Sequence, residues 1–313
     1  MSKNKNKQEL KATRDAFGDQ LAKSGKDNEN IIALSADLGK ATKIDKFGKL
    51  FPDRFFEIGI AENNMIGIAS GMAENGFKVF LASFSSFLTG KYDTIRCSLA
   101  YSKSPAILVG THSGLAIGKD GVTQMGLEDI SLMRSLPNMI VLNPATYIET
   151  IKMVEYLCDT ELDTPHYLRL GRQPVEEIFD DNYKFKFGKG IVIKEGTKGV
   201  VFSTGCILGD VVDATKDLDM TVVNIHTLKP IDYELIKDLT SNTDYVFTVE
   251  DHSIIGGLGS AVAEIMAENG AKSKLVRIGL NDVFPESGPP DQLYEKYGLS
   301  SNKIKEKILN SIK

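Results

Sequence analysis

Short apolar segments alternate with helical segments along almost the whole chain, and this alternation constrains the fold more than any other feature. Most of the apolar segments are continuous runs, which are typical of strands covered on both faces. In the first half we expect strands at Ile31–Leu38, Phe55–Ile60, Lys78–Ser83, Ala106–His112, Met139–Asn143 and His166–Leu170. Because strand–helix–strand crossovers place successive strands in parallel, the pattern predicts α/β architecture.

The alternation is interrupted once. Gln173-Pro174 ends one unit, an acidic stretch follows, and Tyr183, Phe185 and Phe187 then alternate with polar residues, as in an edge strand. The pattern resumes with expected strands at Gly199–Ser203, Thr221–His226, Tyr245–Glu250 and Lys274–Ile278. The sequence therefore predicts two consecutive α/β domains with mainly parallel sheets, at residues 1–188 and 189–313.

Charge and cysteine usage exclude several classes of function. The formal net charge is −5, so no basic excess is available for a nucleic-acid backbone. No apolar run is long enough for a membrane span, and no apolar segment of a signal peptide follows the start. The cysteines Cys97, Cys158 and Cys206 lie far apart, which disfavours disulfides and structural zinc. We expect a cytoplasmic protein without metal ligands of its own.

One strand-to-helix junction stands out, because ligands of open α/β sheets bind beyond the carboxyl ends of strands. After the segment Phe55–Ile60 a helix is expected from Ala61 to Gly76, with Glu62 in its first turn. The simplest interpretation is that Glu62 complements the positive end of the helix. The helix is also rich in small residues, which indicates a closely packed neighbour.

Five segments, in this order, resemble the pyrimidine-binding and C-terminal domains of the transketolase family. They are Ser35–Leu38, Arg54–Glu62, Gly110–His112, Gly118–Gly121 and Glu250–Gly259. Their order and spacing are similar to the bacterial and archaeal form made of two polypeptides. The Gly-Asp-Gly element with which thiamine enzymes hold Mg²⁺ and the diphosphate does not occur in the sequence.

The resemblance implies a C-terminal subunit of a split transketolase, with thiamine diphosphate and Mg²⁺ as cofactors. A partner N-terminal subunit carrying Gly-Asp-Gly would hold the metal and the diphosphate. The resemblance also implies a homodimer of this chain within an α2β2 assembly, which is active only when the partner is present.

The resemblance assigns cofactor contacts to Asp37, Glu62, Leu81, Phe84 and Phe87. Glu62 would be catalytic, because a carboxyl group can share a proton with a ring nitrogen of the aminopyrimidine. Phe84 and Phe87 would form an aromatic pocket for this flat ring, and the alternative is that they pack in the core. Leu81 stands where family members often carry a third aromatic residue.

The resemblance also assigns substrate contacts to His112, Asp120, Gln124 and Arg172. His112 would be catalytic and lie against the sugar, although a histidine at a strand end is more often a core residue. Asp120 would meet a sugar hydroxyl, and Gln124 stands where transketolases usually have a second histidine. Arg172, close to Arg169, would hold the anionic terminus of the sugar, whereas the alternative is a salt bridge to the acidic linker.

The sequence thus predicts transfer of a two-carbon ketol unit from a ketose to an aldose. Gln124, Lys119 and Ala41, which stands where many transketolases offer a serine hydroxyl, favour a non-standard anionic sugar, such as a sulfonated one, over the usual sugar phosphates. Lys40 adds a charge nearby.

Two alternatives stay open. One is an enzyme of related chemistry, either the β-subunit of a 2-oxoacid dehydrogenase or an enzyme similar to deoxyxylulose-phosphate synthase. The other is a non-catalytic scaffold paralogue, which the joint presence of Glu62, Phe84, His112 and Asp120 disfavours. The glycine run at residues 256–259 is interpreted as structural.

Overall fold

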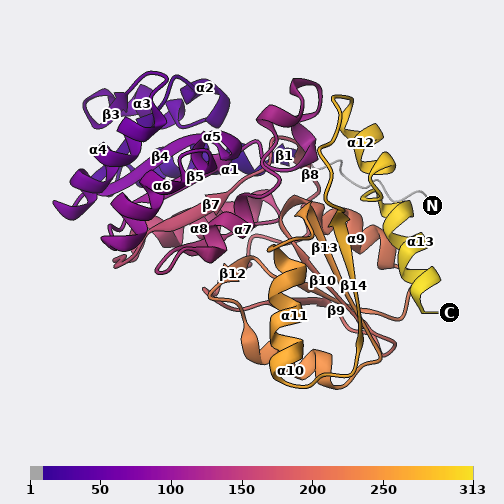
Figure 1. Cartoon of the computed structure of the whole chain (residues 1–313). Coiled ribbons are helices and arrows are strands. Elements are labelled where there is room, and N and C mark those ends of the chain that lie inside the picture. The colour runs from indigo at the N-terminus through magenta and orange to yellow at the C-terminus, as the bar shows by residue number, and fades with distance from the viewer. Residues whose placement is uncertain (1–9, 313) are drawn as a thin grey trace, which may run out of the picture.

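The computed structural model describes residues 10–312 and contains two α/β units, which confirms the predicted fold class (Figure 1). The first unit is built on a sheet of seven strands in the order β12-β6-β7-β5-β4-β2-β3. Its strands are β2 (Ile31–Ser35), β3 (Phe55–Glu57), β4 (Lys78–Phe84), β5 (Ile107–Thr111), β6 (Ile140–Leu142), β7 (His166–Arg169) and β12 (Thr227–Lys229). All neighbouring strands are parallel except β12, which runs antiparallel to β6.

Helices cover both faces of this sheet, as a parallel sheet of apolar strands requires. One face packs against α1 (Thr13–Ser24), α3 (Asp45–Leu50) and α8 (Tyr147–Asp159). The other face packs mainly against α4 (Glu62–Glu74) and α7 (Asp129–Ser135). Shorter helical segments complete the unit: α2 (Gly39–Thr42), η1 (Pro52–Arg54), α5 (Ser85–Thr89), α6 (Tyr92–Ile95), η2 (Arg96–Tyr101), η3 (Leu115–Asp120) and η4 (Val122–Gln124).

The second unit has a five-stranded sheet in the order β14-β13-β10-β11-β9, in which only β9 is antiparallel to its neighbour. Its strands are β9 (Ile191–Lys194), β10 (Val200–Thr204), β11 (Thr221–Asn224), β13 (Tyr245–Ser253) and β14 (Lys274–Leu280). Its helices are η5 (Gly205–Ile207), α9 (Leu208–Thr215), α10 (Tyr233–Ser241), α11 (Leu258–Glu268), α12 (Pro290–Lys296) and α13 (Ser301–Ser311). A small ladder pairs β1 (Lys11–Ala12) with β8 (Pro174–Val175), and the predicted domain boundary falls between β8 and β9.

The edge strand predicted around Tyr183, Phe185 and Phe187 is wrong, because this segment pairs with no strand. The rings of Phe185 and Phe187 instead pack on Tyr156 of α8, with ring centroids 5.2 and 5.6 Å away. The period of two therefore reflects an extended chain that lays alternate aromatic rings on a helix. No helix among residues 10–312 is both long and apolar enough to cross a membrane.

Candidate active site

Most of the predicted site residues lie at the carboxyl edge of the first sheet. Glu62 begins α4, with its side chain mostly buried, and Ser83 near the end of β4 donates a hydrogen bond to its Oε1 over 3.4 Å. Met65 and Ile66 on the apolar side of α4 are fully buried in the core, which fixes the start of the helix on the sheet. Within the described chain Oε2 of Glu62 has no hydrogen-bond partner, so this oxygen can meet a ligand.

Three rings form a stack centred on Phe84, the residue after Ser83, which donates to Glu62. Phe84 ends β4 and stacks on Phe87 of α5, with ring centroids 5.3 Å apart and planes inclined by 17°. His112 stacks on Phe84 at 3.8 Å. Phe84 and Phe87 are only partly buried, so they are not ordinary core residues. The structure therefore brings together a carboxylate and an aromatic surface, the two features that a flat, nitrogen-containing ring requires.

His112 follows β5 with a positive φ of 59°, a backbone conformation that few side chains adopt. Its Nε2 lies 2.9 Å from Nη1 of Arg14, and its Nδ1 lies 2.9 Å from Oγ1 of Thr111. Because a guanidinium only donates hydrogen bonds, Nε2 must accept and Nδ1 must carry the proton. Burial, together with the positive charges of Arg14, Arg172 and Lys43, lowers the pKa of His112 to about 3. The imidazole is therefore neutral at ordinary pH.

Arg14 is a site residue that the sequence reasoning missed. It lies in the first turn of α1 and also donates to the carbonyl of Ala41 over 2.9 Å. Its Nε is buried and has no hydrogen-bond partner in the part of the chain that the structure describes, and burial lowers the pKa of its guanidinium. Nothing in the local pattern connects Arg14 with His112, which lies 98 residues away in the sequence. The scarcity of arginine in a lysine-rich chain is the one signal that points to it.

The predicted substrate residues Asp120 and Arg172 form an ion pair, with Nη1 of Arg172 3.0 Å from Oδ2 of Asp120. Arg172 also donates to the carbonyl of Ile117 over 3.1 Å. The alternative of a salt bridge to the acidic linker is therefore wrong: Arg172 pairs with Asp120, and the buried Arg169 pairs with Asp129. The positive charges of Arg14 and Arg172 both lower the pKa of His112, because both guanidinium groups lie at this end of the site.

Two predicted residues, Gln124 and Asp37, lie at the margins of this arrangement. Gln124 ends η4 with a partly exposed side chain, and its carbonyl accepts a hydrogen bond from Ser86 over 3.0 Å. Asp37 follows β2, is exposed, and has a φ of 59°. It lines a pocket of about 590 Å³ together with Ala41 and Glu57.

Leu81 is fully buried in the core. Its contact with the cofactor stays a prediction. Among residues 10–312, no group of three or more His, Cys, Asp or Glu side chains is arranged to hold a metal ion.

The fold is the one that the two α/β domains of the transketolase family share. Residues 9–177 match the family model described as the transketolase pyrimidine binding domain, and residues 188–304 match the transketolase C-terminal domain. The chain belongs to the transketolase family, as its sequence motifs predicted.

Several relatives match nearly the whole chain. It is 41% identical over 311 residues to a Methanocaldococcus jannaschii protein provisionally named a transketolase C-terminal section, and this match covers 97% of both chains. It is 35% identical to a 6-deoxy-6-sulfo-D-fructose transketolase subunit of a Clostridium species, covering 93% of this chain and 91% of that one. A solved structure titled as an inactive β4 tetramer of a split-gene transketolase superposes with a TM-score of 0.88 at 39% identity, covering 96% of this chain and 98% of that one.

Other relatives are about twice as long. The chain is 36% identical to a 1-deoxy-D-xylulose-5-phosphate synthase of Caldanaerobacter subterraneus, covering 96% of this chain but only 49% of that enzyme. The matched half of such enzymes corresponds to both units described above.

Proposed function

We propose that this chain is the C-terminal subunit of a thiamine-diphosphate-dependent transketolase that moves a two-carbon ketol unit from a ketose to an aldose. The observation that carries the proposal is the convergence of Glu62 with the ring stack of Phe84, Phe87 and His112 at one sheet edge. The split-gene relatives, which match along nearly their whole length, support it.

The residues present fit the aminopyrimidine ring of the cofactor. Phe84 and Phe87 offer partly exposed ring surface, and Glu62 offers an oxygen that has no hydrogen-bond partner among residues 10–312. When bound, thiamine diphosphate supplies a nucleophilic carbon for attack on a carbonyl group. The part of Glu62 is to share a proton with a ring nitrogen, and a buried position keeps water from competing for that proton.

The sugar would lie between His112 and the ion pair of Asp120 with Arg172. The neutral His112 has its Nε2 turned towards Arg14 as an acceptor, so a sugar hydroxyl that displaces Arg14 finds an acceptor there. Asp120 is about half exposed and can accept from a second hydroxyl. Arg14 and Arg172 supply the positive charge that an anionic terminus of the sugar needs.

We further propose a sulfonated sugar as the preferred substrate. Gln124 offers a neutral amide where a histidine is usual, which removes a group that can carry positive charge, and Ala41 offers no hydroxyl, which removes a donor that suits a phosphate. The two guanidinium groups still suit a singly charged oxyanion. The sulfofructose transketolase subunit among the relatives supports this choice.

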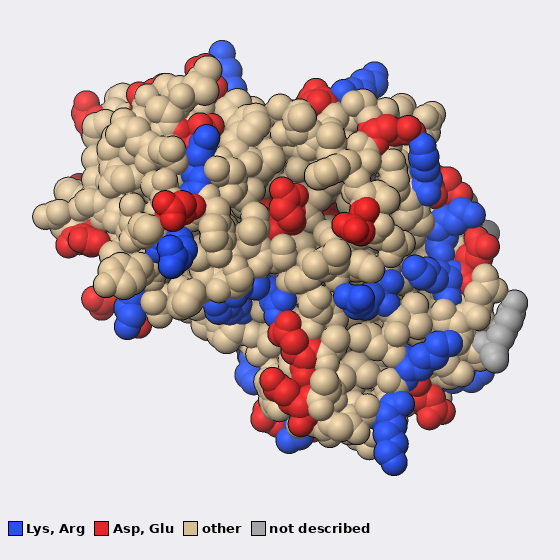
Figure 2. All heavy atoms as spheres, viewed as in Figure 1, with Lys and Arg blue, Asp and Glu red and all other residues tan. Residues whose placement is uncertain are grey.

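A partner chain is proposed to complete the site, because this chain spans about half the length of relatives such as the 1-deoxy-D-xylulose-5-phosphate synthase and its sequence contains no Gly-Asp-Gly. That partner would carry Gly-Asp-Gly, bind Mg²⁺ and hold the diphosphate, and two copies of each chain would form an α2β2 assembly. The exposed apolar side chains of Ile60, which is 83% exposed, and Tyr101, which is 86% exposed, offer surface for such contacts. Figure 2 shows that the visible face of the first unit carries few charged side chains.

The test is reconstitution with the partner that carries Gly-Asp-Gly, followed by a panel of ketose donors and aldose acceptors. We expect ketol transfer with the highest kcat/KM for a sulfonated ketose. If xylulose and ribose phosphates are preferred and Gln124→His does not improve them, the sulfonated substrate is refuted. Decarboxylation of pyruvate in place of ketol transfer would support the oxoacid dehydrogenase or deoxyxylulose-phosphate-synthase alternatives.

A further inference from the structure

A long loop of the first unit is built into the core of the second. The loop at residues 112–128 connects β5 to α7 and carries His112, Asp120 and Gln124. Its apolar side chains share one core cluster with side chains of the second unit. This cluster includes Leu115, Ile117, Met125 and Leu127 from the loop and Val201, Leu208, Val249 and Leu293 from the second unit. The conformation of the loop therefore depends on the C-terminal unit.

Asp251 of β13 holds the start of this loop. Its Oδ1 accepts a hydrogen bond from the backbone N–H of Leu115 over 3.0 Å, and its Oδ2 accepts one from the hydroxyl of Tyr294 over 2.5 Å. Gly114 packs directly on the same carboxylate, because a Cβ at Gly114 would lie 2.0 Å from Oδ2. The side chains of Asp251 and Tyr294 are both buried, so water cannot replace these contacts.

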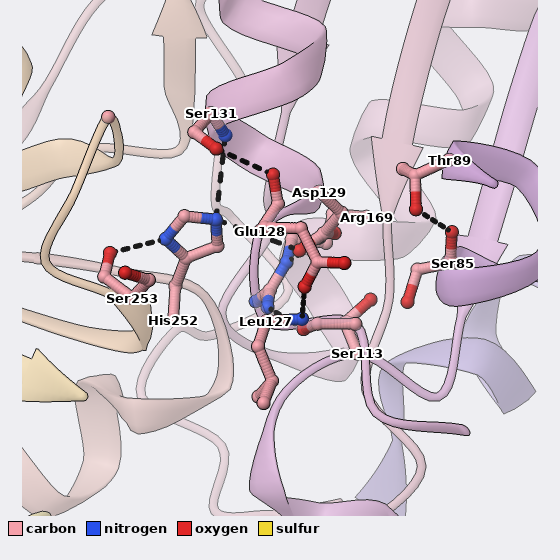
Figure 3. Close-up of polar contacts among 12 residues, drawn as sticks. Ser85, Thr89, Ser113, Leu127, Glu128, Asp129, Ser131, Arg169, His252 and Ser253 are labelled. Carbon is pink, nitrogen blue, oxygen red and sulfur yellow. Dashed lines mark hydrogen bonds and ion pairs between the residues drawn. The ribbon is translucent and has the colours of Figure 1, made fainter. Parts of the chain in front are cut away.

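Arg169 holds the end of the loop. Its Nη2 donates to the carbonyls of Gly126 and Asp251 over 3.1 and 2.9 Å, and its Nε donates to Asp129 over 2.8 Å. Figure 3 shows this buried pair beside Leu127, with His252 of the second unit on its other side. One guanidinium thus joins β7, the loop and β13.

The tip of the loop carries Asp120, which pairs with Arg172 of the segment after β7. Arg172 donates to Ile117 and Asp120 from the first unit. From the second unit, the N–H of Gly288 donates to the carbonyl of Gly118 over 3.4 Å. The next residue after Arg172, Gln173, donates to the hydroxyl of Tyr294 over 3.0 Å. The same tyrosine therefore contacts the anchor of the loop and the segment that carries Arg172.

We propose that Asp251 and Tyr294 of the C-terminal unit are positioning residues for the sugar site, which hold the loop so that Asp120 faces Arg172. This inference rests on the proposed function and deepens it, since it gives the C-terminal unit a role in sugar binding. Neither residue reaches the sugar itself: Asp251 acts through Leu115, and Tyr294 acts through Asp251 and Gln173. Hydrogen bonds to a buried carboxylate are among the stronger ones, so their loss should loosen the loop.

The test compares Tyr294→Phe and Asp251→Ala with the control Glu250→Gln. Glu250 is equally buried on the same strand but accepts from the N–H groups of Leu258 and Gly259, away from the loop. Hydrogen exchange of residues 113–121 is measured on the isolated full chain. We expect exchange at least about tenfold faster in Tyr294→Phe and wild-type exchange in Glu250→Gln. Tyr294→Phe keeps the ring, so the test survives if Asp251→Ala does not fold.

The second readout is steady-state kinetics of the complex with the partner. Tyr294→Phe should raise KM for the sugar about tenfold, with kcat and the affinity for thiamine diphosphate close to wild type. Unchanged exchange overturns the proposal, and so does faster exchange with an unchanged KM. An equal effect in Glu250→Gln also overturns it, because the effect would then reflect general loss of stability. If the wild-type complex transfers no ketol unit, the proposed function fails and the role in sugar binding fails with it, while exchange still decides whether Asp251 anchors the loop.

Discussion

At the scale of single residues, His112 shows how neighbours fix the state of a side chain. Nε2 must accept the hydrogen bond that Arg14 donates, and Nδ1–H donates to the hydroxyl oxygen of Thr111, so one tautomer is selected. The sequence predicted the position of His112 at a strand end. It could not predict its tautomer or its partner Arg14, because the two are joined only by the packing of α1 against the sheet.

Replacing Arg14 by methionine should raise the pKa of His112 from about 3, because a nearby positive charge is removed. Burial is the larger cause of the lowered pKa, so the value should stay below the ordinary 6.5. Since the folded state holds His112 neutral, the free energy of unfolding falls as the pH drops below about 6.5. This fall should be smaller in Arg14→Met than in the wild type. An NMR titration of the His112 ring measures the pKa directly.

Lys43→Met is the matched control for this titration, because Lys43 also lowers the pKa of His112 but by less. The expected order is a larger upward shift in Arg14→Met than in Lys43→Met. A fall in the pKa in Arg14→Met, or equal shifts, would contradict the assigned contact.

Replacing Glu62 by glutamine should leave the fold intact and reduce ketol transfer at least about 100-fold. The amide keeps an oxygen for the hydroxyl of Ser83, but it cannot share a carboxyl proton with the cofactor ring. Turnover of the reconstituted complex is the measurement, with thermal unfolding as a check on the fold. Glu74→Gln, at the exposed far end of α4, should be fully active. Near-normal turnover in Glu62→Gln would remove it from the catalytic residues.

At the scale of elements, the apolar runs predicted the positions of most strands, but not where each strand ends or which strands are its neighbours. The predicted strand Phe55–Ile60 ends at Glu57, since the chain must turn there towards α4. The strands β9 and β12 were missed because they are short, and β12 joins the sheet of the first unit although it comes from the second half of the chain. Such pairing depends on contacts between distant segments, which periodicity does not report.

The buried ion pair between α7 and β7 gives a prediction at this scale. Arg169→Met leaves the fully buried carboxyl group of Asp129 without its ion-pair partner, so the free energy of unfolding should fall by about 3–5 kcal/mol. The double variant Arg169→Met with Asp129→Asn should recover a large part of this loss. Denaturant unfolding measures both. The control is Arg96→Met, because Arg96 is exposed, and its free energy of unfolding should change little. If Arg169→Met is as stable as this control, the role of the buried pair is disproved.

At the scale of the whole molecule, the proposed function gives this chain one side of a cofactor site. Isolated, it should bind thiamine diphosphate weakly or not at all, because the diphosphate needs a metal that the described residues are not arranged to hold. Calorimetry on the isolated chain should show no tight site, and adding the partner should produce one that depends on Mg²⁺. A tight, Mg²⁺-dependent site without a partner would refute the split-site proposal.

The assembly prediction rests on the outer side of α4, the helix that begins with Glu62. Gly67 and Gly71 are exposed on this side, and a Cβ at either position would meet nothing within 4 Å in the isolated chain. Gly67→Leu should therefore fold at least as stably as wild type, since leucine is the better helix former by about 0.5–1 kcal/mol. If α4 faces another chain in an α2β2 assembly, the same leucine should block assembly and activity.

The matched control is Gly209→Leu in α9 of the second unit, because Gly209 is also a helical glycine whose Cβ would meet nothing within 4 Å. Sedimentation of the chain with its partner should show the α2β2 species for wild type and Gly209→Leu, and smaller species for Gly67→Leu. The small residues of α4, which the sequence indicated as a sign of a close neighbour, have open space within the single chain at Gly67 and Gly71. The small size of these residues is then explained by contact with a second chain. An intact, active assembly of Gly67→Leu would show that α4 does not face a second chain.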